Sequence, residues 1–447
     1  VNLFLMDTFW LYVLGVVIFV VGLAISIGLH EIGHLVPAKI FGVRVAQYMI
    51  GFGPTLFSKK VGETEYGVKA IPLGGYISMA GMFPPGDEPV ESPNKVRRLF
   101  GKLVQDARQA SDESMVDLDS SRAFYHLPVW KRIIIMVGGP FMNLVLAFVL
   151  FAILIVGIGQ PAASTTIGSV TQCVTAEGVP ANCSDTTVEG PGVTGGLLAG
   201  DTIVSINGEK VSTWNDGTDT IRASAGKPLT IVVDRDGVNK TLTITPVLAT
   251  RSQVDADGNP VLDASGNPIN QEVGFIGIAT TYKMTPQPIT EVFPVMGQNI
   301  SGVTNMILHL PQRMVDVSNA AFGEGKRDAN GPIGIVGVGR VAGEVASTNQ
   351  VDAVSKGATL IGILASLNIA LFVFNMVPLL PLDGGHIAGA LYEAARRQVA
   401  KWRKRPDPGP FDTAKLMPLT LLVIVLLGSM SALLLYADIF KPVSIFG

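Results

Sequence analysis

Two histidines and a glutamate stand close together in the segment HEIGH, which covers residues 30–34. On a helix, His30 and His34 lie one turn apart on the same face, and Glu31 lies beside them. Two imidazoles in this arrangement can hold a zinc ion, and the carboxylate can act as a general base next to it. The segment therefore predicts metal-assisted hydrolysis, with His30 and His34 as metal ligands and Glu31 as the catalytic base.

A catalytic zinc site usually has three protein ligands and a water molecule, so two histidines leave the site incomplete. The candidate for the third ligand is Asp383, the only acid in the segment NMVPLLPLDGGH of residues 375–386. It lies where an apolar run meets a glycine pair, and a carboxylate in an apolar helix needs a partner or a metal. The glycines allow the backbone to leave the helix and turn the carboxylate inward. His386 is the competing ligand, and we favour Asp383, partly because of the family resemblance given below.

The elements that carry these residues have the composition of membrane spans. Charged residues make up 15% of the 447-residue chain, well below the share of about 25% that is usual in soluble proteins. Four long stretches contain no charged residue, and each reaches the length of about 20 residues that a helix needs to cross the hydrocarbon core. Because HEIGH directly follows the first stretch, the predicted chemistry is hydrolysis inside a lipid bilayer. The stretches are Phe9 to Leu29, Ile133 to Ile158, Ala358 to Leu382 and Leu416 to Ala437.

The distribution of lysine and arginine predicts the orientation of these spans. The connection between the first and second spans contains 13 of them and the connection between the third and fourth contains 7, whereas the much longer central segment contains 12. An excess of these residues marks cytoplasmic loops. Both termini and the central segment are therefore expected outside the cytoplasm. The first span has no basic segment before it, so we expect it to be retained rather than cleaved.

Several segments between the spans have their own patterns. Residues 42–83 contain short alternating runs broken by glycines, which predicts a membrane-associated β-hairpin region. Such a hairpin could pair with an extended substrate by strand addition, or it could serve only to cap the helix bundle. Residues 84–130 are polar and are expected to form a flexible cytoplasmic loop. Residues 283–350 show helical spacing of apolar residues, which predicts an amphipathic helix and a connector.

The central residues 164–282 have the pattern of a compact β-rich domain with a turn-rich insertion. Asn207-Gly208 and Asp236-Gly237 are strong signals for tight hairpin turns. The chain has only two cysteines, Cys173 and Cys183, and both lie in this segment. They could form a disulfide in an oxidising compartment, and the sequence leaves open whether they do. The remaining expected segments are 1–41, 131–159, 358–386 and 416–437 for the four transmembrane helices and 387–415 for a second cytoplasmic loop.

Net charge excludes one class of partner. The chain carries a formal charge of −3 and has no basic patch with interleaved aromatic residues. A nucleic-acid partner is therefore not expected.

Three motifs, in this order along the chain, resemble those of the site-2 protease family of intramembrane zinc metalloproteases, in its bacterial branch with an extracytoplasmic PDZ domain. HEIGH matches the HExxH motif, GGPFMN of residues 138–143 matches the second-span motif, and NMVPLLPLDGGH matches the third. Gly192 to Trp214 is similar to the signature of the PDZ domain. The resemblance covers nearly the whole chain, apart from the polar segment, the cysteine-bearing stretch and the turn-rich insertion.

The resemblance implies a fold, a cofactor and a set of roles. The fold is a polytopic α-helical membrane protein with four transmembrane helices, a membrane-associated β-hairpin region and an extracytoplasmic β-rich PDZ domain. Zn²⁺ would be held by His30, His34 and Asp383, with Glu31 moving protons. Asn375, and with less support Asn143, would hold the substrate backbone in an extended form.

The resemblance also implies partners and a location. The substrates would be transmembrane segments of single-pass membrane proteins, such as anti-sigma factors or remnant signal peptides, and the other partner would be the lipid bilayer. The PDZ domain would exclude substrates whose outer domain is still attached. The protein would be a multi-pass protein of the bacterial cell membrane.

Two other functions are compatible with a metal site in a membrane. A metal permease would need polar residues along several spans, and the second and fourth spans offer almost none. A PDZ scaffold with a structural zinc would need a fourth protein ligand, for which only His386 is a candidate. Glu31 discriminates among the three hypotheses, because only the protease needs it as a base.

Overall fold

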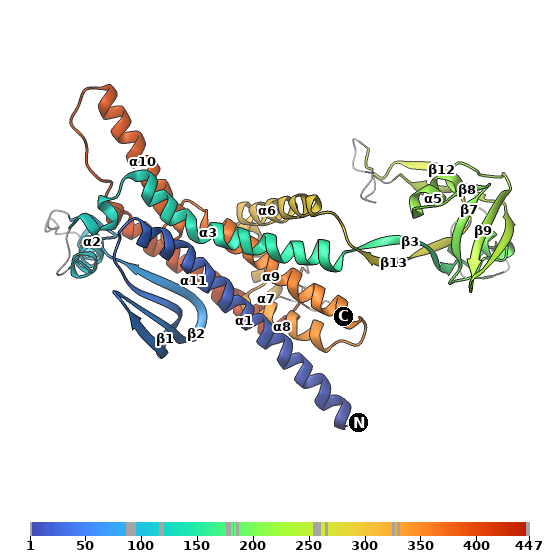
Figure 1. Ribbon diagram of the computed structural model, residues 1–447, viewed down its shortest axis with the longest axis horizontal. Coiled ribbons are helices and arrows are strands. Elements are labelled where there is room, and N and C mark those ends of the chain that lie inside the picture. The colour runs from blue at the N-terminus through green and yellow to red at the C-terminus, as the bar shows by residue number, and fades with distance from the viewer. Residues whose placement is uncertain are drawn as a thin grey trace. The chain divides into compact units, whose positions relative to one another are not determined.

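The computed structural model describes residues 2–85, 95–115, 120–175, 180–181, 183–184, 187–253, 261–263, 267–323, 327–328 and 331–443. The chain divides into two compact units, whose elements are labelled in Figure 1. One unit comprises Val1–Ile158 and Pro288–Gly447 and contains the long helices. The other comprises Gly159–Gln287 and is rich in β-strands.

Among the described residues, four helices are long and apolar enough to cross a membrane. A helix satisfies its own backbone hydrogen bonds, which is what a segment surrounded by lipid requires. Large apolar side chains such as those of Leu422 and Leu426 are exposed on these helices, where lipid can cover them. The predicted polytopic α-helical membrane protein is confirmed. The four helices are α1 (Asn2–Ile40), α3 (Val129–Ala152) with its π-helical continuation η3 (Ile153–Ile158), α9 (Ala353–Asn375) and α11 (Met417–Phe440).

The third span ends earlier than its hydropathy predicts. Helix α9 stops at Asn375, and residues 376–382 separate it from α10 (Asp383–Trp402). This segment contains Pro378 and Pro381, and proline removes a backbone donor and breaks a helix. The prediction of one helix over residues 358–386 is therefore wrong. Asp383 opens the next helix instead of closing the third span.

Helices also occupy the two polar segments that were predicted as loops. Helix α2 (Lys95–Glu113) lies within residues 84–130, and α10 fills half of residues 387–415. Arg108 of α2 forms an ion pair with Asp412. The Ser111 hydroxyl both accepts from the Phe83 amide (3.0 Å) and donates to its carbonyl (2.9 Å). These contacts stabilise α2. The polar composition of this segment, which predicted a loop, did not indicate them. Short 3₁₀ turns follow at η1 (Ser120–Arg122), η2 (Phe124–His126) and η5 (Thr413–Leu416).

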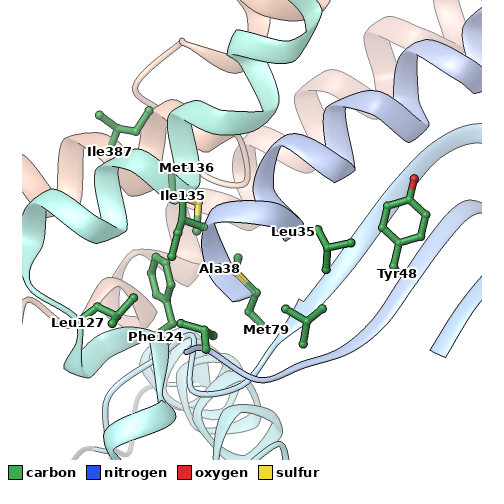
Figure 2. Close-up of a cluster of buried hydrophobic side chains, with 11 residues drawn as sticks. Leu35, Ala38, Tyr48, Met79, Phe124, Leu127, Ile135, Met136 and Ile387 are labelled. Atoms are coloured by element: carbon green, nitrogen blue, oxygen red, sulfur yellow. The ribbon is translucent and has the colours of Figure 1, made fainter. Parts of the chain in front are cut away.

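A long β-hairpin follows α1, as the alternating pattern predicts. Strands β1 (Val45–Val61) and β2 (Thr64–Met79) pair antiparallel. The hairpin is fixed to α1 by the Tyr48 hydroxyl, which donates to the Gly28 carbonyl at 2.8 Å. Burial raises the pKa of Tyr48 to about 12, so this donor stays protonated. Figure 2 shows the shared core, in which Leu35 of α1, Met79 of β2, Ile135 of α3 and Ile387 of α10 are buried together.

Within the described residues, three helices rather than the predicted one lie between the β-rich unit and α9 in the sequence. Residues Val292 and Met296 pack against Ala147 and Ile369, which join the first of these helices to α3 and α9. A side chain at Gly15 would meet the Ala342 carbonyl at 2.4 Å, so the third helix approaches α1 closely. The three helices are α6 (Val292–Leu308, preceded by η4, Ile289–Glu291), α7 (Leu310–Phe322) and α8 (Ile335–Ser347).

In the β-rich unit, an antiparallel sheet has the strand order β10-β9-β7-β3-β13, with β8 beside β7. The two predicted tight turns are present, because Asn207, Gly208, Asp236 and Gly237 all have positive φ. The core is formed by residues such as Ile167, Ile206 and Ile231. The elements are β3 (Gln160–Val170), β4 (Cys173–Val174), β5 (Pro180–Ala181), β6 (Val188–Glu189), α4 (Pro191–Thr194), β7 (Thr202–Ile206), β8 (Glu209–Lys210), α5 (Trp214–Arg222), β9 (Leu229–Arg235), β10 (Val238–Ile244), β11 (Val247–Ser252), β12 (Asn270–Phe275) and β13 (Ile278–Thr285).

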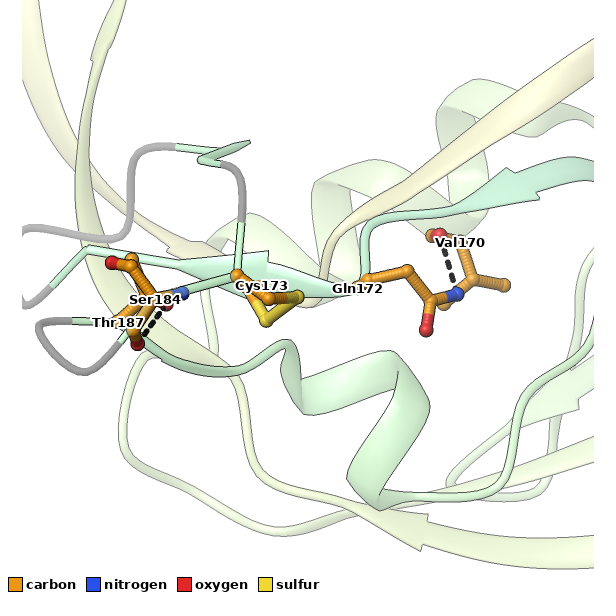
Figure 3. The surroundings of a disulfide bond; sticks show 6 residues. Val170, Gln172, Cys173, Ser184 and Thr187 are labelled. Atoms are coloured by element: carbon orange, nitrogen blue, oxygen red, sulfur yellow. Dashed lines mark hydrogen bonds between the residues drawn. A yellow bond between two sulfur atoms is a disulfide. The ribbon is translucent and has the colours of Figure 1, made fainter.

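The two cysteines form a disulfide, which the sequence had left open. Cys173 and Cys183 are joined, with Cα atoms 5.2 Å apart, beside the Ser184–Thr187 turn (Figure 3). The disulfide bond links Cys173 of β4 to a residue 10 positions further along the chain. The predicted turn-rich insertion lies between the paired strands β11 and β12, and its residues 254–260 and 264–266 lie outside the described residues.

Candidate metal centre

His30, His34 and Asp383 converge, although Asp383 comes from the opposite end of the sequence. The Nε2 atoms of the two histidines are 3.2 Å apart. Oδ2 of Asp383 lies 3.3 Å from Nε2 of His30 and 3.4 Å from Nε2 of His34. Their side chains are 12%, 5% and 17% exposed, respectively. Within the described residues, these three form the group of histidine and carboxylate ligands able to share one ion.

The spacing of the three atoms fits zinc. In a tetrahedral site with bonds of about 2.0–2.1 Å, neighbouring ligand atoms lie about 3.3–3.4 Å apart. The observed distances match that edge. Oδ2 of Asp383 is buried and has no hydrogen-bond partner among the described residues, which suits an atom that coordinates a metal. Two imidazoles and one carboxylate are also a donor set of catalytic zinc sites, in which the fourth position stays open for water.

Residues of α3 contact the Nδ1 atoms of both histidines, on the side of each ring away from the metal site. Nδ1 of His34 donates to the Ile135 carbonyl at 2.7 Å, so its Nε2 is left for the metal. Nδ2 of the Asn143 amide lies 3.0 Å from Nδ1 of His30. The buried Oδ1 of Asn143 has no hydrogen-bond partner among the described residues. Rotating the amide by half a turn would bring Oδ1 to this position, where it would accept the Nδ1 proton and leave Nε2 of His30 for the metal. Partners of this kind fix the tautomer and the ring orientation of a metal-binding histidine.

Three glycines allow α1 and α3 to approach at this point. A side chain at Gly33 would meet the Gly138 carbonyl at 2.1 Å, and one at Gly138 would meet the Gly33 carbonyl at 2.0 Å. A side chain at Gly139 would lie 2.1 Å from Nε2 of His34. Small residues at helix crossings in membranes have this function. The glycines inside HEIGH and GGPFMN therefore make room for the site.

Glu31 is buried beside the hairpin. Its side chain is 8% exposed, and Gly75 of β2 passes so close that a side chain there would meet Cγ of Glu31 at 3.1 Å and Ile27 at 2.8 Å. The strand thus runs directly past the residue that the sequence predicts as the base. An extended peptide added to this hairpin would lie near the same carboxylate.

The remaining predicted residues are placed differently. Asn375 is the last residue of α9 and is half-buried. Its side chain makes no hydrogen bond within the described part of the chain, so its substrate role stays a prediction. Asn143, also predicted to contact substrate, bonds to His30, and its substrate role likewise stays a prediction. His386, the competing ligand, is outside the converging group. Ile135 and Gly139 were not predicted as parts of the site; they lie one turn apart on the face of α3 that also carries Asn143.

The comparisons with known proteins agree with this geometry. The family model described as peptidase family M50 matches residues 18–406. The chain is 33% identical to the zinc metalloprotease Rip1 of Mycobacterium tuberculosis over 98% of this chain and 100% of that protein. It is 32% identical to Rip1 of Mycolicibacterium smegmatis, with 97% and 99% covered. It is 28% identical to the metalloprotease MmpA of Caulobacter vibrioides, with 88% of each chain covered. This chain therefore belongs to peptidase family M50, the site-2 protease family of intramembrane zinc metalloproteases.

Proposed function

We propose that this member of the family hydrolyses peptide bonds within the transmembrane segments of single-pass membrane proteins. The observation that carries the proposal is the meeting of His30, His34 and Asp383 at zinc-like spacing, with Glu31 buried beside them on a membrane-spanning helix. The family membership makes the chain a zinc metalloprotease. The position of His30, Glu31 and His34 on an apolar, membrane-spanning helix favours substrates that are themselves in the membrane.

In the proposed mechanism, His30, His34 and Asp383 would hold Zn²⁺. When bound, the metal would supply Lewis acidity for the scissile carbonyl and for the attacking water. Glu31 takes a proton from the attacking water and later delivers it to the leaving amine. Ile135 and Asn143 keep both histidine rings in the required orientation.

A substrate helix must be unwound first, because its peptide groups are already hydrogen-bonded within the helix. The β1–β2 hairpin supports a route for this step. Strand addition would hold the unwound segment by main-chain hydrogen bonds, and Gly75 places β2 next to Glu31. Asn375, at the end of α9, would hold the substrate backbone from the other helix.

The β-rich unit is proposed to act as an extracytoplasmic PDZ domain that excludes substrates whose outer domain is still attached. Three observations support this. The Gly192–Trp214 stretch contributes helix α4 and the sheet strands β7 and β8. Strand β13 lies at the end of the strand order, and PDZ-type domains add a peptide strand at a sheet edge. The Cys173–Cys183 disulfide favours an oxidising compartment outside the cytoplasm.

The proposed location is the bacterial cell membrane, with both chain termini on the same outer side as the PDZ domain. The lysine and arginine distribution supports this orientation. Anti-sigma factors and remnant signal peptides are the proposed substrate classes. Membranes from cells that carry Glu31→Gln should accumulate single-pass intermediates that wild-type membranes lack, and quantitative proteomics of the two membranes measures this.

The purified chain provides the direct test of the proposed chemistry. The Glu31→Gln variant should bind zinc as wild type does and lose cleavage of a tagged single-pass substrate in liposomes by a factor of about 10² or more, because a positioned general base contributes about 10²–10⁴. Metal analysis and gel-based cleavage are measured on the same preparation. Cleavage at the wild-type rate by Glu31→Gln would rule out the proposed role of Glu31.

A further inference from the structure

The buried residues of α3 form one continuous stripe, and the metal site occupies only part of it. Ile135, Gly139 and Asn143 recur at intervals of four residues, so they lie on one face of the helix. All three serve the histidines of α1, as described above. Arg132 is buried on the same face, one turn before Ile135. It faces the helix that carries the third candidate ligand.

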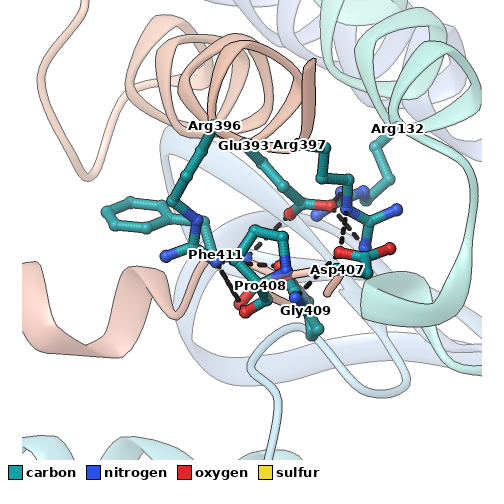
Figure 4. A network of polar contacts seen from close by, with 9 residues as sticks. Arg132, Glu393, Arg396, Arg397, Asp407, Pro408, Gly409 and Phe411 are labelled. Carbon is teal, nitrogen blue, oxygen red and sulfur yellow. Dashed lines mark hydrogen bonds and ion pairs between the residues drawn. The ribbon is translucent and has the colours of Figure 1, made fainter. Parts of the chain in front are cut away.

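Arg132 forms an ion pair with Glu393 of α10, with an N–O distance of 2.6 Å. The two side chains are 9% and 0% exposed. Arg397 also reaches the Glu393 carboxylate at 3.0 Å, and the Phe411 amide donates to its other oxygen at 2.8 Å. Figure 4 shows Glu393 held among these groups. A carboxylate buried this completely needs such partners, because its charge is otherwise costly away from water.

Helix α10 connects this ion pair to Asp383. Asp383, Ile387, Ala390 and Glu393 are spaced by four, three and three residues, so they lie on one face of α10. Ile387 packs against Ile135 and Met136 of α3 between the two ends. The candidate ligand therefore opens the helix, and the ion pair lies about 15 Å further along it. Because a helix is stiff, its position at Glu393 sets the position of Asp383.

We propose that the Arg132–Glu393 ion pair is a positioning device for zinc binding, which fixes α10 on α3 so that Asp383 reaches the two histidines. A buried ion pair is weak evidence for stability, because well-packed apolar residues in its place often stabilise a protein equally or more. What a charged pair adds is a fixed register between two helices. Metal ligation requires such a register, since ligand distances tolerate deviations of only about 0.2 Å. Helix α3 thus positions all three candidate ligands.

The chain contains a matched control for this inference. Arg327 and Asp438 form a second buried ion pair, at 2.7 Å and with exposures of 3% and 0%. Asp438 also accepts from the Gly337 amide at 2.8 Å, so this pair joins α11 to the start of α8. Neither residue lies on α3 or α10. Breaking it removes a buried ion pair without disturbing the α3–α10 register.

The experiment measures the zinc dissociation constant of the purified full-length protein by competition with a chromophoric chelator. Glu393→Gln should raise this constant at least about tenfold, the lower end of the effect of losing a direct hydrogen-bond partner of a ligand, because α10 would no longer hold Asp383 against the two histidines. Asp438→Asn should lower the thermal midpoint and leave the constant at its wild-type value. An unchanged constant in a folded Glu393→Gln protein would overturn the inference.

A second variant decides the matter if Glu393→Gln does not fold. Arg132→Met combined with Glu393→Leu removes both charges and keeps apolar packing between the helices. It should fold and still bind zinc more weakly than wild type, and wild-type affinity in this variant would also overturn the inference.

The inference rests on the proposed ligand set, so Asp383→Ala is measured in parallel. If Asp383→Ala binds zinc normally, the ligand set is wrong; if it loses zinc while both Glu393 variants keep it, only the positioning role is wrong.

Discussion

At the scale of single residues, the site depends on which nitrogen of each histidine is free. His34 donates from Nδ1 to the Ile135 carbonyl, and His30 meets the Asn143 amide through Nδ1. Both rings therefore present Nε2 to Asp383. A backbone carbonyl cannot be removed by substitution, but Asn143 can be replaced, and its role is open to a direct test.

Asn143→Leu should weaken zinc binding about 10–100-fold, because His30 loses the acceptor that fixes its ring. Asn143→Asp should retain zinc, because a carboxylate also accepts the Nδ1 proton. Zinc titration of both purified variants measures the difference. If Asn143→Leu binds zinc normally and instead raises KM for a membrane substrate, the substrate role predicted from the sequence is correct and the role at His30 is not.

The sequence was sufficient to predict which residues meet at the candidate metal centre but not which residues support them. His30, Glu31 and His34 follow from helical spacing alone. Asp383 follows from the cost of a carboxylate in an apolar run together with the family resemblance. The partner of Asn143 lies 113 residues away, so it depends on where two helices cross. No local pattern identifies that partner. The stripe of residues at four-residue intervals on α3 indicates only which face of the helix is buried.

At the scale of elements, the crossing of α1 and α3 decides whether the site can form. Gly33 and Gly138 contact each other's carbonyls with no room for a side chain. Both helices are otherwise apolar, and apolar character alone would permit many crossings. The glycine pair selects the crossing at which His34 reaches Ile135.

Gly138→Ala should destabilise the protein by about 1–3 kcal/mol through overpacking and should weaken zinc binding, because α1 must move away from α3. Gly157→Ala is the control, since a side chain there would meet nothing within 4 Å. Thermal unfolding and zinc titration of the two variants test this. Equal behaviour of both variants would show that the close approach is not needed.

Element boundaries were the least predictable feature of the fold. The four apolar stretches predicted the spans because hydropathy reports what a membrane accepts. It does not report where the backbone leaves the helix, so the break after Asn375 was hidden by the apolar residues that follow. Helix α2 was missed for the opposite reason, since contacts with Ser111 and Arg108, rather than apolar composition, hold it in place.

At the scale of the whole molecule, the two units have different sources of stability. The helical unit relies on the membrane and on helix crossings. The β-rich unit has its own apolar core and a buried ion pair, in which Arg235 binds Asp201 through two contacts of 2.7 Å. The Leu198 amide also donates to this carboxylate at 2.9 Å.

This ion pair gives the β-rich unit a predictable pH dependence. The hydrogen bond from Arg235 holds the pKa of Asp201 below its usual range. A group whose pKa is lower in the folded state stabilises that state above its unfolded pKa of about 3.9. The contribution is lost as the pH falls below that value toward the folded pKa. Hydrogen exchange of β7 and β9 in the full-length protein should therefore lose protection below about pH 4, and Asp201→Asn should weaken this dependence. Identical pH profiles for the two proteins would contradict the assignment.

Zinc-dependent hydrolysis inside the membrane is tested most directly by the position of the bond that is cut. A tagged single-pass substrate is incubated with the full-length protein in liposomes, and the products are mapped by mass spectrometry. We predict a cut within the apolar segment that disappears on zinc chelation, returns with added zinc and is absent with Glu31→Gln. A cut confined to the soluble flank of the substrate, or one that survives chelation, would contradict the account.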